Sequence, residues 1–380
     1  MTRVERIKTL EALAPLEEPW KRLAESIPNL PVFLTWEWVN TWVCVFREDR
    51  TLCVLTVYDA QDELLGIAPF VIENRSVGPL TARHMRFIGG GVVASDHLDV
   101  LARPGFDRQV CAACIEYLQG CKGEWDVLVL EGLASDSVLR DVLASSEGTY
   151  RERQPISCPY VTLPEDWRTF ELTVLSANRR QQLRRRLRQL NGDYDDNVQF
   201  RQMKRLEHLP EAFDRLVSLN RARWVDKPGS TSFDREKFVE FHRRISMQAL
   251  ERGWLRLYEL VVDGEVIATQ YSFAYKGIYY DYQKGFDPEW SRYSPGQLML
   301  AHLIKEAIED GAWKLDLLRG DEDYKTSWTS NDTTDTHALF ALRGRGKMWM
   351  TAVAALDVAK LIGRRALPGF IQDKLVEIAT

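Results

Sequence analysis

The residues best suited to chemistry in this chain lie together between Asp316 and Lys325. The segment LDLLRGDEDYKTSW, which begins at Leu315, places an aspartate inside a short apolar run. Three more acids, an arginine, a tyrosine and a lysine then follow in quick succession. Carboxylates crowded at the end of an apolar strand tend to have a raised pKa, so they suit general acid–base catalysis. A salt-bridged turn without a catalytic role is the alternative interpretation.

A second candidate site precedes this segment, at the start of a predicted helix. Ser294-Pro295-Gly296 opens an apolar-striped stretch, and a serine cap with proline in the first turn is typical of a helix start. The free amides and the dipole of such a start can bind a phosphate. The short link at Asp310-Gly311 implies that this start lies near the acidic tip, at the sheet edge where α/β proteins bind ligands. A capped helix without a ligand also fits.

The elements that must position these residues occur twice. Residues 52–72 and 254–287 each predict a β-hairpin, the second with its turn at Asp263-Gly264. Residues 106–133 and 294–321 each predict a helix followed by a short apolar strand. We infer an internal duplication that builds mixed α/β sheets with helices on their faces.

A strongly basic helix is predicted between the two copies. It contains six arginines from Arg179 to Arg188 and no acid, and Asn191-Gly192 marks its end. A solvated charged face is the plain interpretation. The functional one is attraction of an anionic partner, such as a polysaccharide, a lipid headgroup or a nucleotide tail. RNA fits least well because no aromatic residues interleave the arginines, so nucleic acid is not the expected partner.

Several motifs resemble one protein family. Asp316 to Glu322, Tyr324-Lys325 and Trp328, preceded by Tyr293 to Gly296, resemble the CelD/BcsL-type branch of the GNAT acyltransferase superfamily. The segments FLTWEWVNTW (33–42) and GGGVVASDHLDVL (89–101) and the arginine-rich helix are similar to the same branch. That branch is related to the FemABX peptidoglycan transferases, which are tandem GNAT-like domains, in agreement with the duplication.

The resemblance implies an α/β fold of tandem duplicated GNAT-like domains and an acyl-CoA, acetyl-CoA in the simplest case, as co-substrate. The pyrophosphate would lie at the helix start and the pantetheine arm along Tyr279 to Lys284. Only Gly296 remains of the usual glycines of the phosphate loop, and the first half is expected to bind no cofactor. The implied cofactor-binding residues are Tyr293, Ser294, Gly296, Gln297 and Leu298.

Acyl transfer needs a base for the acceptor's proton and an acid for the leaving group. The candidate bases are Asp316, Asp321 and Glu322, and the candidate acid is Tyr324. Arg319, Lys325 and Asp281 are predicted to bind substrate, with Lys325 neutralising a phosphate.

The N-terminal half offers two weaker candidates. Trp36 and Glu37 are predicted to line an acceptor cleft, whereas Trp38 and Trp42, four residues apart, are expected in the core. Asp96, His97 and Asp99 form a possible acid–base group, although a lone histidine beside a strand is usually structural.

Composition sets further limits. The chain has 380 residues and a net charge of −5, which indicates neither nucleic acid nor an anionic membrane as the main partner. Six cysteines, of which only Cys111 and Cys114 are closely spaced, complete no zinc set, so we expect reduced thiols and no metal. An acidic start and the lack of any apolar run of about eighteen residues favour a soluble, cytoplasmic protein. Trp349, Arg364 and Arg365 on an amphipathic helix leave peripheral membrane contact open.

We predict four segments: an N-terminal GNAT-like domain (1–170), a connector (171–253) with the basic helix 178–190, a catalytic GNAT-like domain (254–346), and an amphipathic helix with a tail (347–380). The predicted function is acyl transfer from a CoA thioester to an amine or hydroxyl, on a small molecule or glycan precursor of cell-envelope or exopolysaccharide biosynthesis. Two alternatives stay open. One is an aminoacyl-tRNA-dependent FemABX-like transferase, which would use a basic patch. The other is a non-catalytic GNAT-fold scaffold of a polysaccharide machine.

Overall fold

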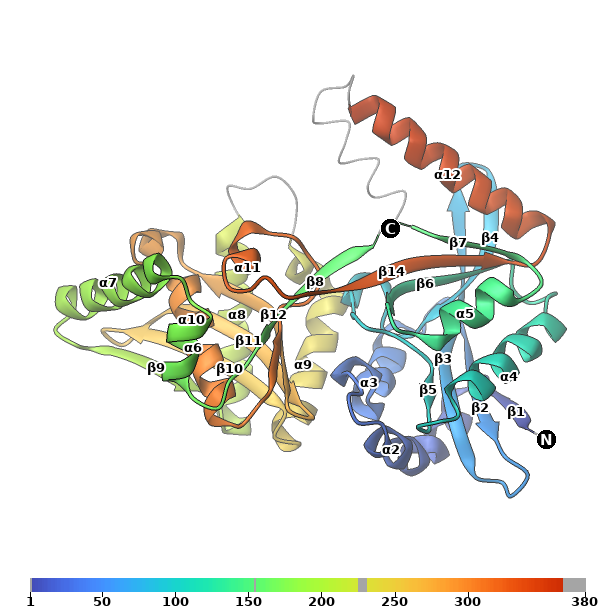
Figure 1. Cartoon of the computed structure of the whole chain (residues 1–380), viewed down its shortest axis with the longest axis horizontal. Helices are drawn as coiled ribbons and strands as arrows, with labels where there is room; N and C mark the ends of the chain where they lie inside the picture. The colour runs from blue at the N-terminus through green and yellow to red at the C-terminus, as the bar shows by residue number, and fades with distance from the viewer. Residues whose placement is uncertain (1, 154, 225–230, 365–380) are drawn as a thin grey trace. The chain divides into compact units, whose positions relative to one another are not determined.

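The computed structural model describes residues 2–153, 155–224 and 231–364 and divides the chain into two compact units. Unit 1 comprises Met1–Ile156 and Thr334–Thr380, and unit 2 comprises Ser157–Thr333 (Figure 1). Unit 2 is therefore inserted into the chain of unit 1. The division falls before the boundary predicted after residue 170, because strand β8 (Ile156–Thr162) already pairs with β13 (Lys314–Asp316).

Unit 1 is built on a mixed sheet with the strand order β1-β2-β3-β4-β6-β14, in which β5 also pairs with β3 and β7 with β14. The strands are β1 (Arg3–Ile7), β2 (Arg50–Tyr58), β3 (Leu64–Val77), β4 (Leu80–Phe87), β5 (Leu101–Ala102), β6 (Val127–Ala134), β7 (Thr149–Glu152) and β14 (Asp332–Ala341). The α-helices are α1 (Leu10–Leu13), α2 (Glu17–Ser26), α3 (Trp36–Phe46), α4 (Asp107–Gly120), α5 (Val138–Ser145) and α12 (Gly344–Arg364).

Unit 2 has the strand order β8-β13-β12-β11-β10-β9. Its further strands are β9 (Val198–Gln202), β10 (Leu255–Val262), β11 (Glu265–Tyr275) and β12 (Ile278–Phe286). Its α-helices are α6 (Trp167–Thr173), α7 (Ala177–Asp193), α8 (Leu209–Trp224), α9 (Glu236–Glu251), α10 (Pro295–Glu309) and α11 (Asp323–Thr326). The basic helix predicted at 178–190 is α7.

The two units repeat one pattern, which confirms the predicted α/β fold of two GNAT-like copies. Unit 1 runs β2-β3-β4-α4-β6 and unit 2 runs β10-β11-β12-α10-β13. In each, the helix crosses over between two parallel strands, β4 with β6 and β12 with β13. The hairpin turn predicted at Asp263-Gly264 is present, and both residues have positive φ, 50° and 83°.

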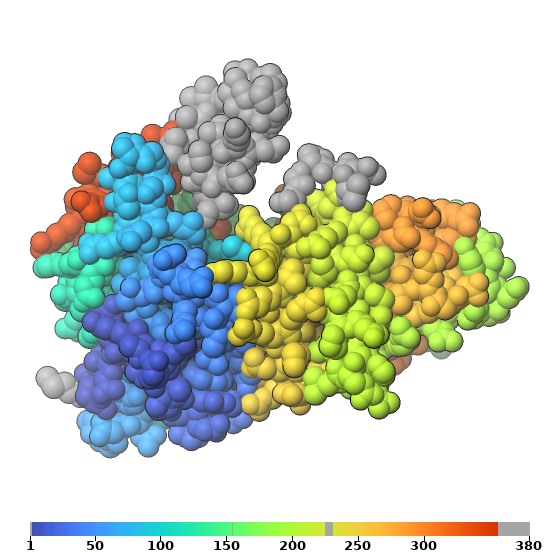
Figure 2. Space-filling view, turned by 180° about the vertical axis from the view of Figure 1, so that it is seen from behind, coloured from blue at the N-terminus to red at the C-terminus, as the bar shows by residue number. Residues whose placement is uncertain are grey.

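The sheet of unit 2 carries helices on both faces. Helix α10 packs on β10, β11 and β12 and also contacts α6 and α7. Helix α8 contacts β11 and β12, and helix α9 contacts β10. The yellow-green and yellow atoms of α8 and α9 form much of the unit 2 surface in Figure 2. The core on the α10 side includes Tyr258, Ile267, Tyr279, Leu300, Leu303, Leu315 and Trp328, all at most 2% exposed.

Strand β12 is irregular in two ways that matter for a site. Tyr271 pairs with Gln283 but Ser272 pairs with Asp281, so a β-bulge leaves Tyr282 as an extra residue. In addition, β12 pairs with β13 only from Ile278 to Tyr280. The two parallel strands therefore part directly before Asp281, and the rest of β12 has no strand on that side among the described pairs.

The C-terminal helix α12 packs on unit 1. The indole of Trp349 is 8% exposed and meets the ring of His84 edge-on, with 4.2 Å between ring centroids. Trp349 is therefore a core residue and not a membrane-surface residue. Arg365 and the tail beyond it lie outside the described residues. No helix in the described ranges is long and apolar enough to span a membrane.

Candidate active site

The acidic segment forms a tight turn after β13, and its shape depends on two unusual backbone positions. Leu318 has φ 58° and Gly320 has φ 123°. The φ of Gly320 lies in a region that side-chain-bearing residues rarely adopt, so the backbone favours glycine there. The ammonium of Lys325, 3% exposed, closes the turn by donating to the carbonyls of Leu318 at 3.2 Å and Arg319 at 2.6 Å.

Lys325 also forms an ion pair with Glu322 at 2.9 Å. An ammonium has three N–H donors, and these three partners account for all of them. Lys325 thus holds the turn in this structure, and no N–H remains for the phosphate that it was predicted to neutralise. Arg319, half-buried, contributes its carbonyl to the same turn.

The three candidate bases differ in access. Asp316 is 0% exposed: its Oδ1 accepts from the Leu318 amide at 2.9 Å and its Oδ2 lies 2.8 Å from the Lys314 ammonium. Its carboxylate therefore shapes the turn. Asp321 and Glu322 are exposed, and Asp321 has no hydrogen bond or ion pair within the described part of the chain.

Tyr324 lies beside a buried acid–lysine pair on β12. The ammonium of Lys284 is 4.6 Å from the centre of the Tyr324 ring and 2.6 Å from Oδ2 of Asp281. Burial raises the pKa of the Tyr324 phenol above its usual range, and the charge of Asp281 adds to that effect. The phenol therefore keeps its proton at neutral pH, as a general acid must.

Asp281 is held from a second side by Gln270. The Gln270 amide nitrogen donates to Asp281 Oδ1 and, at 3.2 Å, to the Ser272 hydroxyl. The Gln270 side-chain oxygen is fully buried and has no hydrogen-bond partner among the described residues. The predicted substrate-binding residue Asp281 is thus the centre of a polar cluster at the point where β12 leaves β13.

The start of α10 differs from the expected capped helix. Ser294 occupies the N-cap position with φ 56° and makes no side-chain capping bond within the described chain. Its carbonyl instead accepts from the amides of Gln297 at 2.9 Å and Leu298 at 3.2 Å. Since Pro295 has no N–H, the Gly296 amide is the first-turn donor left open. Tyr293, just before, is buried and donates its hydroxyl to Asp193 at 2.6 Å.

A pocket joins this helix start to the basic helix. It measures about 460 Å³ including the part open to solvent. Helices α7 and α10, which supply its lining residues, lie side by side (Figure 1). Its lining residues are Arg179, Gln182, Leu183, Arg185, Arg186, Ser294, Gln297 and Leu298. The sequence-predicted phosphate residues Ser294, Gln297 and Leu298 and half of the arginine run therefore face one space.

The pocket arginines have no acidic partners in the part of the chain that the structure describes. Arg179 donates to Gln297 Oε1 at 2.7 Å, and Arg186 donates to the carbonyl of Arg292. No carboxylate forms an ion pair with Arg179, Arg185 or Arg186 in the described ranges. Burial alone shifts the pKa of Arg179 downward. A half-buried cation without a counter-charge makes the pocket suited to an anion such as a phosphate.

The N-terminal candidates lie in unit 1. Trp36 and Glu37 are each 5% exposed; Trp36 packs edge-on against Trp20, and Glu37 is 3.9 Å from Lys21. Both are interior residues of α3, so neither lines an open cleft in unit 1. Trp38 and Trp42 are buried, as expected.

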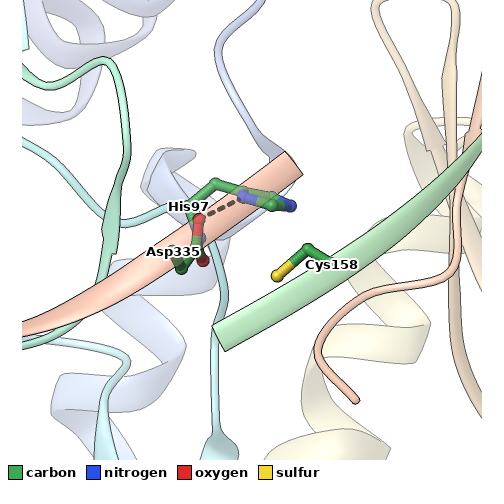
Figure 3. A group of neighbouring side chains, drawn as sticks. All are labelled: His97, Cys158 and Asp335. Carbon is green, nitrogen blue, oxygen red and sulfur yellow. Dashed lines mark hydrogen bonds and ion pairs between the residues drawn. The ribbon is translucent and has the colours of Figure 1, made fainter. Parts of the chain in front are cut away.

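The predicted acid–base group of Asp96, His97 and Asp99 does not form a single site. His97 Nδ1 lies 2.8 Å from Asp335 Oδ1 (Figure 3), and the His97 backbone amide donates to Asp335 Oδ2 at 2.7 Å. Asp99 accepts instead from the Ser137 hydroxyl at 2.7 Å, and burial raises its pKa to about 7. Asp335, which no local motif marks, is thus the partner of His97.

Residues 177–326 match the family model described as an acetyltransferase (GNAT) domain. This segment is therefore a GNAT-fold, acyltransferase-like domain, in agreement with the predicted superfamily. No curated protein matches the sequence. The CelD/BcsL-type branch stays a prediction.

Solved structures show the same fold across most of the chain. FemX has a TM-score of 0.60 and 11% identity and covers 91% of this chain and 99% of its own. The C-terminal domain of a putative lysylphosphatidylglycerol synthetase from Agrobacterium fabrum has a TM-score of 0.54 and 11% identity, with 90% and 96% covered. A conserved protein of unknown function from Bacteroides thetaiotaomicron has a TM-score of 0.53 and 14% identity, with 90% and 100% covered.

Several site residues were missed from the sequence. Lys284 and Gln270 form the cluster around Asp281, and Gln182 lines the anion pocket. No signal in the sequence marked Lys284, because it follows Asp281 by three positions and only a bulge brings such a pair to one face of a strand.

Proposed function

We propose that unit 2 transfers an acyl group from a phosphate-bearing donor, a CoA thioester, to an amine or hydroxyl. The observation that carries this proposal is the pocket in which Arg179, Arg185 and Arg186 face the start of α10, with no ion pair to an acidic side chain among the described residues. A helix start and unpaired guanidinium groups are the two commonest ways in which proteins hold phosphate.

The reaction follows from the groups beyond this pocket. Asp321 or Glu322, the exposed acids, takes the acceptor's proton while the acceptor nitrogen or oxygen bonds the acyl carbon. The carbon–sulfur bond breaks, and the Tyr324 phenol gives its proton to the leaving thiolate. The parted edge of β12 beyond Tyr280 offers backbone donors and acceptors for an extended donor arm. The acceptor is an amine or hydroxyl of a cell-envelope or exopolysaccharide precursor.

An aminoacyl-tRNA donor is the second candidate. It is favoured by Arg188, which lies outside the pocket and is exposed, so it extends the positive charge along α7, whereas Arg184 is paired with Glu171 at 3.2 Å. The fold shared with FemX is compatible with either donor.

Thermal unfolding with each donor tests the proposal. A ligand at one hundred times its Kd adds about 2.7 kcal/mol of stability, which raises Tm measurably. Acetyl-CoA is expected to raise Tm and aminoacyl-tRNA is not. The reverse result selects the tRNA-dependent reaction. If neither donor has an effect at millimolar acetyl-CoA, the protein is a non-catalytic GNAT-fold scaffold and the proposal is wrong.

A further inference from the structure

Gln297 is shared between the anion pocket and the turn that carries Tyr324. Its side-chain oxygen accepts from Arg179 Nη1 at 2.7 Å and from the indole N–H of Trp328 at 3.0 Å. An amide oxygen has two lone pairs, so both are used. One atom on the first turn of α10 thus connects α7 with the segment after α11.

The orientation of Arg179 depends on this contact. Its guanidinium lies 5.3 Å from the centre of the Trp328 ring, and Gln297 is its one hydrogen-bond partner within the described chain. With no carboxylate to hold it, the planar guanidinium is oriented toward the pocket by Gln297 and by stacking on Trp328.

Trp328, the second partner of the Gln297 oxygen, anchors the turn that carries Tyr324. Trp328 is 1% exposed, and its backbone amide donates to the carbonyl of Lys325 at 2.9 Å. Lys325 in turn holds the carbonyls of Leu318 and Arg319. The Trp328 indole therefore anchors the C-terminal end of the segment that contains Tyr324.

We propose that Gln297 is a positioning residue that couples occupancy of the anion pocket to the placement of the Tyr324 turn. An anion that binds Arg179 changes the hydrogen bond that Gln297 makes with it, and the bond to Trp328 responds because the same oxygen accepts both. This inference rests on the proposed function for the identity of the donor, but the coupling itself needs only a phosphate in the pocket.

The coupling can be measured with inorganic pyrophosphate and coenzyme A as probes. The full chain is labelled with 5-fluorotryptophan, and Trp328→Phe identifies the Trp328 signal among the twelve tryptophans in the ¹⁹F spectrum. Each probe is expected to shift the Trp328 signal of the unmodified protein. Gln297→Leu is expected to weaken binding about tenfold, through loss of a charge-assisted hydrogen bond, and to abolish the shift at saturation.

Two further variants separate positioning from mere folding. Gln182→Leu removes an amide that lines the same pocket but bonds Asn178 at 3.3 Å, so the Trp328 shift should persist. Gln297→Glu keeps both acceptor positions, and thus the fold, but pairs with Arg179, so pyrophosphate binding should fall on the order of a hundredfold.

An unmoved Trp328 signal in the saturated wild-type protein overturns the inference, and so does an equal shift in Gln297→Leu. The inference is also overturned if neither pyrophosphate nor coenzyme A binds the wild-type protein. If pyrophosphate moves Trp328 while neither acetyl-CoA nor aminoacyl-tRNA binds, the coupling stands and the proposed function fails.

Discussion

At the scale of single residues, burial assigns different roles to chemically similar groups. Asp316 is enclosed and paired with Lys314, whereas Asp321 lies on the surface without a partner in the described chain. The Lys325 ammonium donates its hydrogen bonds within the turn, whereas the Lys284 ammonium lies between Asp281 and the Tyr324 ring. The position of each group relative to water therefore decides which can exchange protons with a substrate.

Tyr324→Phe tests the proposed acid. Burial raises the pKa of Tyr324 above its ordinary value of about 10, so the protonated, active form persists to higher pH than for a free tyrosine. The single-turnover rate of acyl transfer should not fall between pH 7 and about pH 10 through this group. The substitution should lower that rate by about 10²-fold or more.

The matched control for this prediction is Tyr150→Phe in unit 1, which removes a hydroxyl bonded to Glu152. It should leave the rate unchanged. A rate for Tyr324→Phe within twofold of wild type would remove Tyr324 from the mechanism.

The sequence identified the types of residue in the site better than their contacts. The acid-rich turn does follow β13, and Ser294, Gln297 and Leu298 do line the pocket beside α7, because strand ends and helix starts follow from local pattern. The pairing of Asp281 with Lys284 could not be predicted, since residues three apart on a regular strand face opposite sides. Which of the six arginines face the pocket depends on how α7 packs on α10, and the sequence of α7 alone does not contain that information.

At the scale of elements, strand β12 organises the site. Its bulge brings Asp281 and Lys284 to one face, and its separation from β13 opens the edge beside them. The close approach of α8 fixes the far end of β12, where a Cβ on Gly285 would clash with the backbone of Leu219 and Asn220. The Asn220 side chain also donates to the carbonyl of Lys284 at 2.8 Å.

Gly285→Ala tests this packing. The added methyl must push α8 away from β12, because its neighbours are backbone atoms that cannot rotate aside. We expect a loss of about 1–3 kcal/mol in the free energy of unfolding, measured by urea denaturation. Donor binding should weaken as well, because the edge of β12 moves.

Gly192→Ala is the corresponding control in α7. A Cβ there meets no atom within 4 Å, and alanine favours a helix over glycine by about 1 kcal/mol. That variant should be as stable as wild type or more so. If both substitutions leave stability unchanged, the close packing of α8 on β12 is not a constraint.

Hairpins and the basic helix were predictable, whereas the unit boundary was not. Asp263-Gly264 and the arginine run are local signals. The assignment of β8 to unit 2 depends on pairing with β13, about 150 residues later in the chain, which no local pattern records. The side-chain cap predicted at Ser294 is absent for a reason that also lies outside the local pattern. The preceding 3-10 turn, Pro288–Tyr293, leaves Ser294 in a left-handed conformation that an N-cap residue rarely adopts.

At the scale of the whole molecule, one GNAT-like pattern occurs twice, but the anion pocket and the proposed catalytic residues all lie in unit 2. The family match covers residues 177–326, from the basic helix to the turn with Tyr324. It therefore contains both the anion pocket and the Asp281 cluster. In unit 1 the corresponding crossover helix is α4, and its start has no run of arginines beside it in the sequence.

The most direct test of the central claim is calorimetric titration of acetyl-CoA into wild-type protein and two arginine variants. Arg179→Met removes a pocket cation that has no acidic partner, and should weaken binding about tenfold or more. Arg188→Met removes an exposed charge of the same helix that does not line the pocket, and should change the Kd less than about twofold. Equal affinities for wild type and Arg179→Met, or equal losses in the two variants, would contradict a donor-phosphate site between α7 and α10.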